Sequence, residues 1–235
     1  MFSYLSKKES LSVAGMTAAL YAAVYFYERG AASELNIPLE LITLSIPTIS
    51  NDIMIIFFFS VPIVTISIVL LMWAKGNKKK KAAAHLGISG VYLAASYLML
   101  NFPLKDLPFV GFFALLLLIP LSHWMPLDSE KEAISFEEGN IATFGVQIIN
   151  IAATLFFFSF TFISLGRSSV HDNELTTFVK DNKEYAIVKV YDENVFTWSV
   201  VNGKIIRHLT YFRMENINGL EFNQKKFKSD IKNKE

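Results

Sequence analysis

Five long apolar segments constrain this 235-residue chain more than any other feature of its sequence. They cover residues 11–27, 53–73, 83–101, 107–121 and 141–165. A membrane helix needs roughly 20 apolar residues to cross a hydrocarbon core about 30 Å thick, and the second and fifth segments reach that length easily. The fourth is short, because 15 residues rise only about 22 Å. The pattern predicts an α-helical multi-pass membrane protein with four spans plus one short or re-entrant segment, or with five spans.

A cluster of lysines after the second segment predicts the orientation of these helices. The cluster consists of Lys75, Lys78, Lys79, Lys80 and Lys81. Short basic loops stay in the cytoplasm, so we expect this loop and the N-terminus on the cytoplasmic side of a bacterial inner membrane. The C-terminus lies outside if all five segments span, and inside if the fourth is re-entrant. We favour a cytoplasmic C-terminus, because Arg167 follows the last segment and the tail is rich in lysine.

The sequence after the fifth segment changes from apolar runs to β-type alternation. Residues 184–191, 195–201 and 204–212 are strand candidates, and Asn202-Gly203 between the last two favours a type I′ hairpin turn. We therefore predict a β-meander over residues 184–222. The predicted domains are a transmembrane helical domain (1–166), a small β-rich polar domain (167–222) and a basic flexible tail (223–235).

Two rows of side chains predict close helix packing. Gly15, Ala19 and Ala23 recur every fourth residue of the first segment, and such small residues allow two helix backbones to approach closely. In the fifth segment a polar row follows one helix face: Thr143, Gln147, Asn150, Thr154 and Thr161. This row fits packing within the chain, the axis of a symmetric homo-oligomer, or the lining of a pore.

The sequence offers little support for catalysis. It contains no cysteine, which excludes disulfides and thiolate sites. It has no phosphate-binding glycine loop, no nucleophile elbow and no helical pair of zinc-binding histidines. We expect a protein that is not an enzyme, needs no cofactor or metal, and does not bind nucleic acid directly.

The aromatic side chains of the predicted sheet suggest a protein partner. A meander this small buries little area by itself, and aromatic residues often anchor interfaces. The expected partner-binding residues are Phe196, Trp198, Tyr211 and Phe212. The leading hypothesis is a membrane sensor or scaffold that contacts membrane lipids, forms homo-oligomers and recruits a soluble effector through its C-terminal domain. The alternative is an oligomeric channel or membrane-permeabilising effector lined by the polar row of residues 141–165.

The order of these parts, from residue 11 to residue 222, resembles the membrane subunits (KwaA) of bacterial Kiwa anti-phage defence systems. The resemblance lies in a lysine-divided set of helices followed by a compact β-rich tail, and no single motif carries it. It implies a homo-oligomeric membrane sensor whose cytoplasmic part binds a soluble, KwaB-like effector.

Overall fold

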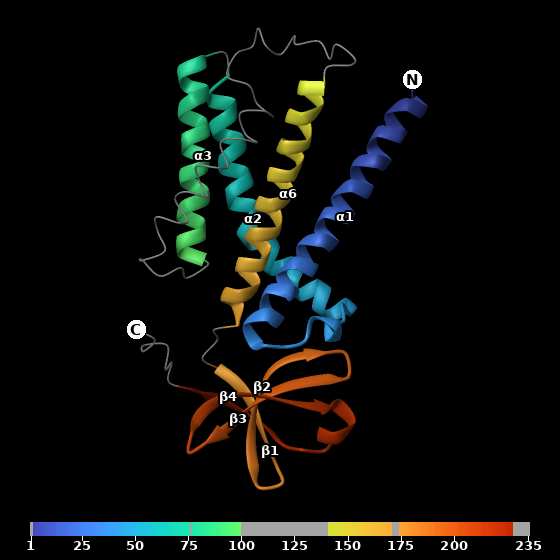
Figure 1. Ribbon diagram of the computed structural model, residues 1–235, viewed down its shortest axis with the longest axis vertical. Helices are drawn as coiled ribbons and strands as arrows, with labels where there is room; N and C mark the ends of the chain where they lie inside the picture. The colour runs from blue at the N-terminus through green and yellow to red at the C-terminus, as the bar shows by residue number, and fades with distance from the viewer. Residues whose placement is uncertain (1, 76, 100–140, 171–173, 228–235) are drawn as a thin grey trace. The chain divides into compact units, whose positions relative to one another are not determined.

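Four α-helices and a five-stranded sheet make up the computed structural model (Figure 1), which describes residues 2–75, 77–99, 141–170 and 174–227. Side chains are described for residues 13–75, 77–98, 148–170 and 174–227. The helices are α1 (Phe2–Leu35), α2 (Ile46–Trp73), α3 (Lys78–Met99) and α6 (Ile141–Ser169), and a 3-10 turn, η1 (Leu39–Leu41), follows α1.

Short polar side chains set the starts of two of these helices. The Ser45 hydroxyl accepts a hydrogen bond from the backbone N–H of Thr48 at the start of α2. The Asn77 side-chain oxygen accepts from the N–H groups of Lys79 and Lys80 at the start of α3. Both are N-caps, which satisfy donors that lack a partner within the helix. Four lysines of the cluster, residues 78–81, thus open α3, and Lys75 lies in the turn after α2.

The prediction of four or five spans is wrong for the described residues. Only α2 and residues Ile148–Ser169 of α6 are long and apolar enough to cross a membrane. The first predicted segment lies within α1, and residues 83–99 of the third lie within α3; the many alanine, serine and glycine residues of these helices add little hydropathy. The fourth segment, residues 107–121, falls outside the described residues.

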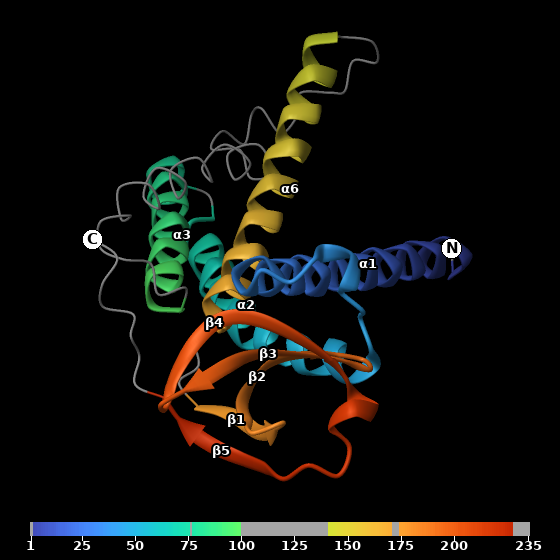
Figure 2. The same ribbon diagram turned by 60° about the horizontal axis from the view of Figure 1, so that its bottom comes forward.

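The sheet is antiparallel and has the strand order β4-β3-β2-β1-β5 (Figure 2). Its strands are β1 (Glu174–Lys180), β2 (Lys183–Tyr191), β3 (Asn194–Val201), β4 (Lys204–Arg213) and β5 (Phe222–Lys226). A second 3-10 turn, η4 (Met214–Ile217), follows β4, and the chain then pairs β5 with β1 at the other edge. The three predicted strands are confirmed as β2, β3 and β4. The sequence prediction missed β1, and it placed most of β5 in the flexible tail.

Left-handed residues make the tight turns between these strands. Asn202 and Gly203 have φ values of 51° and 73°, which confirms the predicted type I′ geometry. Asp181 and Asn182 do the same between β1 and β2, with φ values of 52° and 57°. Asparagine and aspartate tolerate this conformation because their short polar side chains can bond locally to the backbone.

The sheet has an apolar core on each face. One face carries the sheet core, built on Phe178, Val195 and Ile217, with Tyr185 and Phe212 packed against it. The other face carries Tyr191, Phe196 and Trp198, which pack against Ala32, Leu35 and Ile37 from the end of α1 and the residues just after it. Neighbouring residues of a strand face opposite sides, so Val195 and Phe196 belong to different cores.

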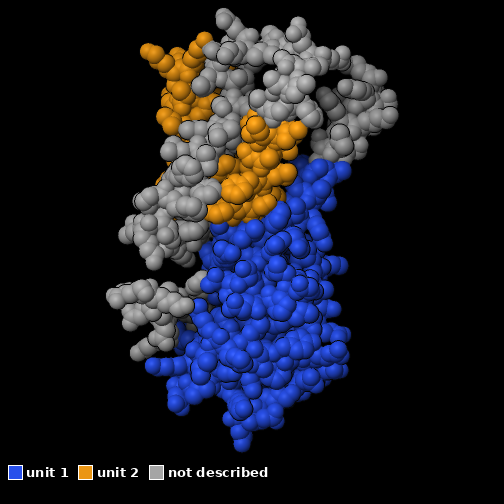
Figure 3. Space-filling view, viewed as in Figure 1, with its two compact units in different colours: residues 1–53, 163–235 blue, residues 54–162 orange. Residues whose placement is uncertain are grey.

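The chain forms two compact units whose boundaries differ from the predicted domains (Figure 3). One contains residues 1–53 and 163–235, and the other contains residues 54–162. The first unit therefore combines the sheet with α1, the start of α2 and the end of α6. The boundaries differ because α1 continues for two more turns beyond Tyr27, where its apolar run ends, and those turns cover the sheet.

Candidate functional site

A fully buried glutamate lies where α1 meets the sheet. The Glu28 side chain has no exposed surface, and its Oε1 lies 2.6 Å from the Nζ of Lys189. The Tyr191 hydroxyl donates to its Oε2 at 2.5 Å. Both donors come from β2, so one carboxylate of α1 binds two side chains of the sheet. A buried charge is tolerated only when it is paired and hydrogen-bonded in this way.

A β-bulge in β2 places both donors on the same face as Glu28. The register with β3 shifts between Ile187 and Lys189, which leaves Val188 as the extra residue. Ile187 packs on the sheet core, and regular alternation would send Tyr191 to that same face. The bulge changes this alternation, so Tyr191 instead lies among the residues that meet α1.

The environment of Tyr191 keeps it a hydrogen-bond donor. Burial raises the pKa of its hydroxyl, and the neighbouring Glu28 carboxylate raises this pKa further. The phenol therefore stays protonated throughout the physiological pH range and continues to donate to Glu28.

Asp52 extends this cluster to the start of α2. Its side chain is buried, at 1% exposure, and lies close enough to Glu28 and Lys189 to interact with both electrostatically. Its second oxygen, Oδ2, has no hydrogen-bond partner among the described residues. We call Glu28, Asp52, Lys189 and Tyr191 the junction cluster, because they join α1, α2 and the sheet.

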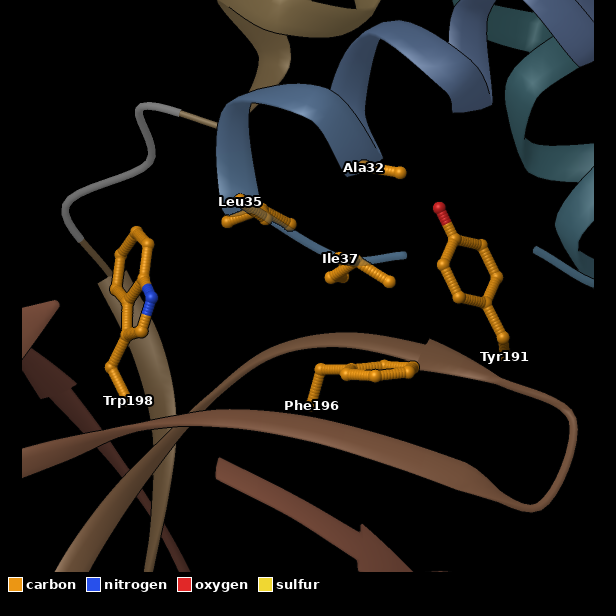
Figure 4. Close-up of a cluster of buried hydrophobic side chains, with 6 residues drawn as sticks. All are labelled: Ala32, Leu35, Ile37, Tyr191, Phe196 and Trp198. Atoms are coloured by element: carbon orange, nitrogen blue, oxygen red, sulfur yellow. The ribbon is translucent and has the colours of Figure 1, made fainter. Parts of the chain in front are cut away.

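Apolar side chains from α1 and from the sheet pack together beside the junction cluster (Figure 4). Ala32, Leu35 and Ile37 come from the α1 side, and Phe196 and Trp198 rise toward them from β3. The chain turns back toward the sheet at Asn36, whose φ is 58°, and the Ile37 N–H bonds to the Ala32 carbonyl at 2.8 Å. This left-handed helix end directs Ile37 into the contact.

Two glycines bring α1 and α6 into backbone contact in the same unit. A Cβ atom added at Gly30 would lie 2.1 Å from the Ile163 carbonyl oxygen, and one added at Gly166 would lie 1.8 Å from the Tyr27 carbonyl oxygen. Each helix therefore presents a glycine to the backbone of the other. Small residues allow this separation, which no larger side chain fits.

The predicted helix-packing residues of α1 lie elsewhere. Gly15 and Ala19 are exposed, nothing lies within 4 Å of a Cβ at Gly15, and only Ala23 is buried. Sequence reasoning missed Gly30 because it ended the helix at Tyr27. The continuing run of small residues, Gly30-Ala31-Ala32, was the signal that could have located the contact.

The predicted partner-binding residues divide into two groups. Phe196 and Trp198 are 1% and 8% exposed, because the end of α1 covers them. Phe212 is half-buried on the sheet core, where its ring lies 5.6 Å from that of Phe178. Tyr211 is 47% exposed on β4, an edge strand, and its hydroxyl donates to Asn194. Of the four, Tyr211 is the most accessible to another protein.

The polar row of α6 belongs to the second unit and is partly buried there. Asn150 and Thr161 are buried, and the Tyr92 hydroxyl of α3 lies 2.6 Å from the Thr161 hydroxyl. Thr154 is exposed and donates to the Asn150 carbonyl. The side chains of Thr143 and Gln147 fall outside the described part of the chain. The contact with Tyr92 supports the first of the three interpretations, packing within the chain.

The junction cluster is suited to holding elements together. Its members are two carboxyl groups, one ammonium and one phenol, and the Lys189 ammonium and the Tyr191 phenol bond to Glu28. Within the described ranges, no three histidine, aspartate or glutamate side chains gather as metal ligands would. The sequence prediction missed all four members, although a glutamate within a helical run of apolar residues is itself a signal of a buried partner.

Comparisons with known proteins add no relative. No protein-family model, no curated protein and no solved structure matches the chain. The function must therefore be inferred from the residues and contacts described above.

Proposed function

We propose that this chain is a non-enzymatic membrane sensor or scaffold subunit, which forms homo-oligomers and recruits a soluble partner through its sheet. The proposed contact is the sheet rim, by which we mean the edge strand β4 with the exposed Tyr211. The observation that carries the proposal is the junction cluster. Lys189 and Tyr191 of the sheet share one buried carboxylate with α1, and Asp52 brings in the start of α2. A partner bound to the sheet would thereby act on the end of a candidate membrane span.

The connection extends to the second candidate span. The end of α6 lies in the unit of the sheet, and Gly166 contacts the backbone of α1 at Tyr27 and Ala31. Packed interfaces shift between discrete arrangements more readily than they deform. Movement of the sheet would therefore be passed to the ends of both α2 and α6, as a sensor requires.

The charge pattern of α2 supports a location for the sheet that differs from the one expected from sequence. A helix that crosses the membrane has its two ends on opposite faces. α2 starts in the unit that contains the sheet and ends just before Lys75, where the lysines begin. Because short basic loops stay in the cytoplasm, the sheet belongs on the outer face of the membrane. A KwaB-like effector, which the resemblance to Kiwa subunits implies, would require the cytoplasmic face.

The exposed face of α1 supports assembly with further copies. Gly15 and Ala19 are open, and the apolar side chains of Val13 and Met16 beside them are 61% and 67% exposed. A small-residue row of this kind can receive the same row of a second chain. The channel alternative gains no comparable support, because Thr161 of the polar row bonds to Tyr92 in the same chain.

Cysteine labelling tests the location of the sheet. The chain has no native cysteine, so single cysteines can replace Lys75, after α2, and Lys204, at the exposed start of β4. In intact cells, a membrane-impermeant maleimide should label Lys204→Cys and spare Lys75→Cys. Both should react after the membrane is opened with detergent. The reverse pattern would place the sheet in the cytoplasm and favour the Kiwa-like arrangement.

Photo-crosslinking tests recruitment by the sheet. A photoreactive phenylalanine analogue in place of exposed Tyr211 should form a covalent adduct with a second protein in cells of the native organism. The matched control is Tyr185, which is half-buried and stacked on Phe178 at 5.6 Å, and it should give no such adduct. Adducts only between copies of this chain would assign the rim to the homo-oligomer and contradict partner recruitment.

A further inference from the structure

A pocket beside the crossing of α1 and α6 combines two arginines with an apolar wall. Its volume is about 580 Å³. Its polar lining consists of Arg29, Ser33 and Asn36 from the end of α1, with Arg167 from α6. Its apolar lining consists of Ile37, Pro38, Leu39 and Ile163. Ligand sites of this volume are typically apolar with a few polar groups that fix the ligand.

Within the described residues, no acidic partner explains the position of the two arginines. Neither forms an ion pair with an acidic side chain in the described part of the chain. Arg29 is the only lysine or arginine in residues 9–74, and Arg167 is the only one in residues 141–179. Two isolated cations from distant parts of the sequence thus line one pocket. Arg167 also lies near the C-terminus of α6, where the helix dipole favours a cation, but that effect does not involve Arg29.

The local fold explains how the pocket forms. Gly30 and Gly166 allow the two helices to touch, so the residues just beside them on each helix, Arg29 and Arg167, reach the same space. The left-handed turn at Asn36 then sends the chain back past the helix end, where Pro38 and Leu39 form a wall. The pocket therefore depends on the helix crossing and is not a chance surface feature.

We propose that this pocket binds the phosphate-bearing headgroup of an anionic membrane lipid. Arginine guanidinium groups donate two parallel hydrogen bonds to phosphate oxygens, which lysine cannot do. The end of a membrane span lies at the level of the lipid headgroups, so a pocket lined by arginines there can meet the phosphate of a lipid. Arg167 is in the last turn of candidate span α6, and Ile163, one turn earlier, offers apolar surface to the lipid glycerol and upper acyl chains.

This inference rests on the membrane location in the proposed function and adds a ligand to it. The sensor proposal concerns Tyr211 and the sheet rim, whereas the lipid site concerns Arg29 and Arg167. Failure of the lipid site would leave crosslinking from Tyr211 unchanged, and failure of crosslinking would leave lipid binding unchanged.

The test uses the full chain in nanodiscs of phosphatidylcholine, with and without phosphatidylglycerol. After gentle release, native mass spectrometry should detect bound phosphatidylglycerol on the unaltered chain. The double variant Arg29→Gln/Arg167→Gln should bind it at least about tenfold more weakly, since it removes both charged donors to the phosphate. The matched control removes the other two arginines of the chain, Arg207 and Arg213, both exposed on β4, and should retain the lipid.

A second variant keeps both charges and fills the pocket. Ser33 is exposed and lines it, so Ser33→Phe should also displace the lipid while the thermal unfolding profile stays normal. Equal lipid binding by the pocket variants and the control would overturn the proposal. Inorganic phosphate tests the alternative ligand of the same pocket. If it stabilises the detergent-solubilised chain through Arg29 and Arg167 as strongly as the lipid does, the pocket binds free phosphate and the lipid assignment fails.

Discussion

Alanine in place of Gly166 should destabilise the chain by roughly 2 kcal/mol or more, the upper part of the range for overpacking a well-packed contact. The added methyl group would lie 1.8 Å from the Tyr27 carbonyl oxygen and 3.0 Å from the Ala31 backbone nitrogen. Backbone atoms cannot move aside as a flexible side chain can, so the two helices must separate. The same argument applies to Gly30→Ala, which meets the Ile163 carbonyl.

Thermal unfolding in mild detergent measures this effect, with another helix glycine as the matched control. A Cβ at Gly90 would meet nothing within 4 Å. Alanine favours the helix over glycine by roughly 1 kcal/mol, so Gly90→Ala should hold or raise the melting temperature. Gly166→Ala should lower it by several degrees, at about 2–4 °C per kcal/mol for a chain of this size. A melting temperature for Gly166→Ala as high as that of Gly90→Ala would contradict the close crossing.

The sequence predicted the sheet better than the helices because its signals there are local. Asn202-Gly203 determines a hairpin by its own backbone preference, and the strands on either side follow from alternation. The bulge at Val188 carries no comparable signal. It is visible only in the pairing of β2 with β3, and it decides that Lys189 and Tyr191 face α1.

Helix ends were harder to predict, and the candidate site depends on them. Tyr27-Glu28-Arg29 marks the end of an apolar run, and polar residues there normally indicate a membrane boundary. The helix nevertheless continues to Leu35, because Lys189 and Tyr191 neutralise and bond the buried carboxylate of Glu28. The partners lie more than 160 positions away, so no local pattern could reveal the pairing. The same long-range contact covers Phe196 and Trp198, which sequence reasoning assigned to a partner protein.

Methionine in place of Lys189 should destabilise the chain by roughly 3 kcal/mol, because removing one partner of a buried ion pair leaves the other charge without compensation. Glu28 has no exposed surface, so water cannot replace the lost ammonium, and the carboxylate keeps the Tyr191 hydroxyl as a donor with the Asp52 side chain beside it. The Lys189 side chain itself is 21% exposed, and this places the expected effect at the lower end of the range for fully buried pairs. The melting temperature should fall by roughly 6–12 °C.

A surface pair and a double substitution separate charge burial from loss of packing. Lys225 and Glu184 lie 2.5 Å apart with side chains that are 51% and 22% exposed, so Lys225→Met should cost less than about 1 kcal/mol. Adding Glu28→Gln to Lys189→Met removes the unpaired charge but keeps an oxygen that can accept from Tyr191. The double variant should therefore recover most of the stability that Lys189→Met loses. If it melts as low as Lys189→Met alone, the loss comes from the lysine side chain's packing. If Lys189→Met melts as high as Lys225→Met, Glu28 is not held as a buried charge, and the sheet and α1 are joined by the apolar contact alone.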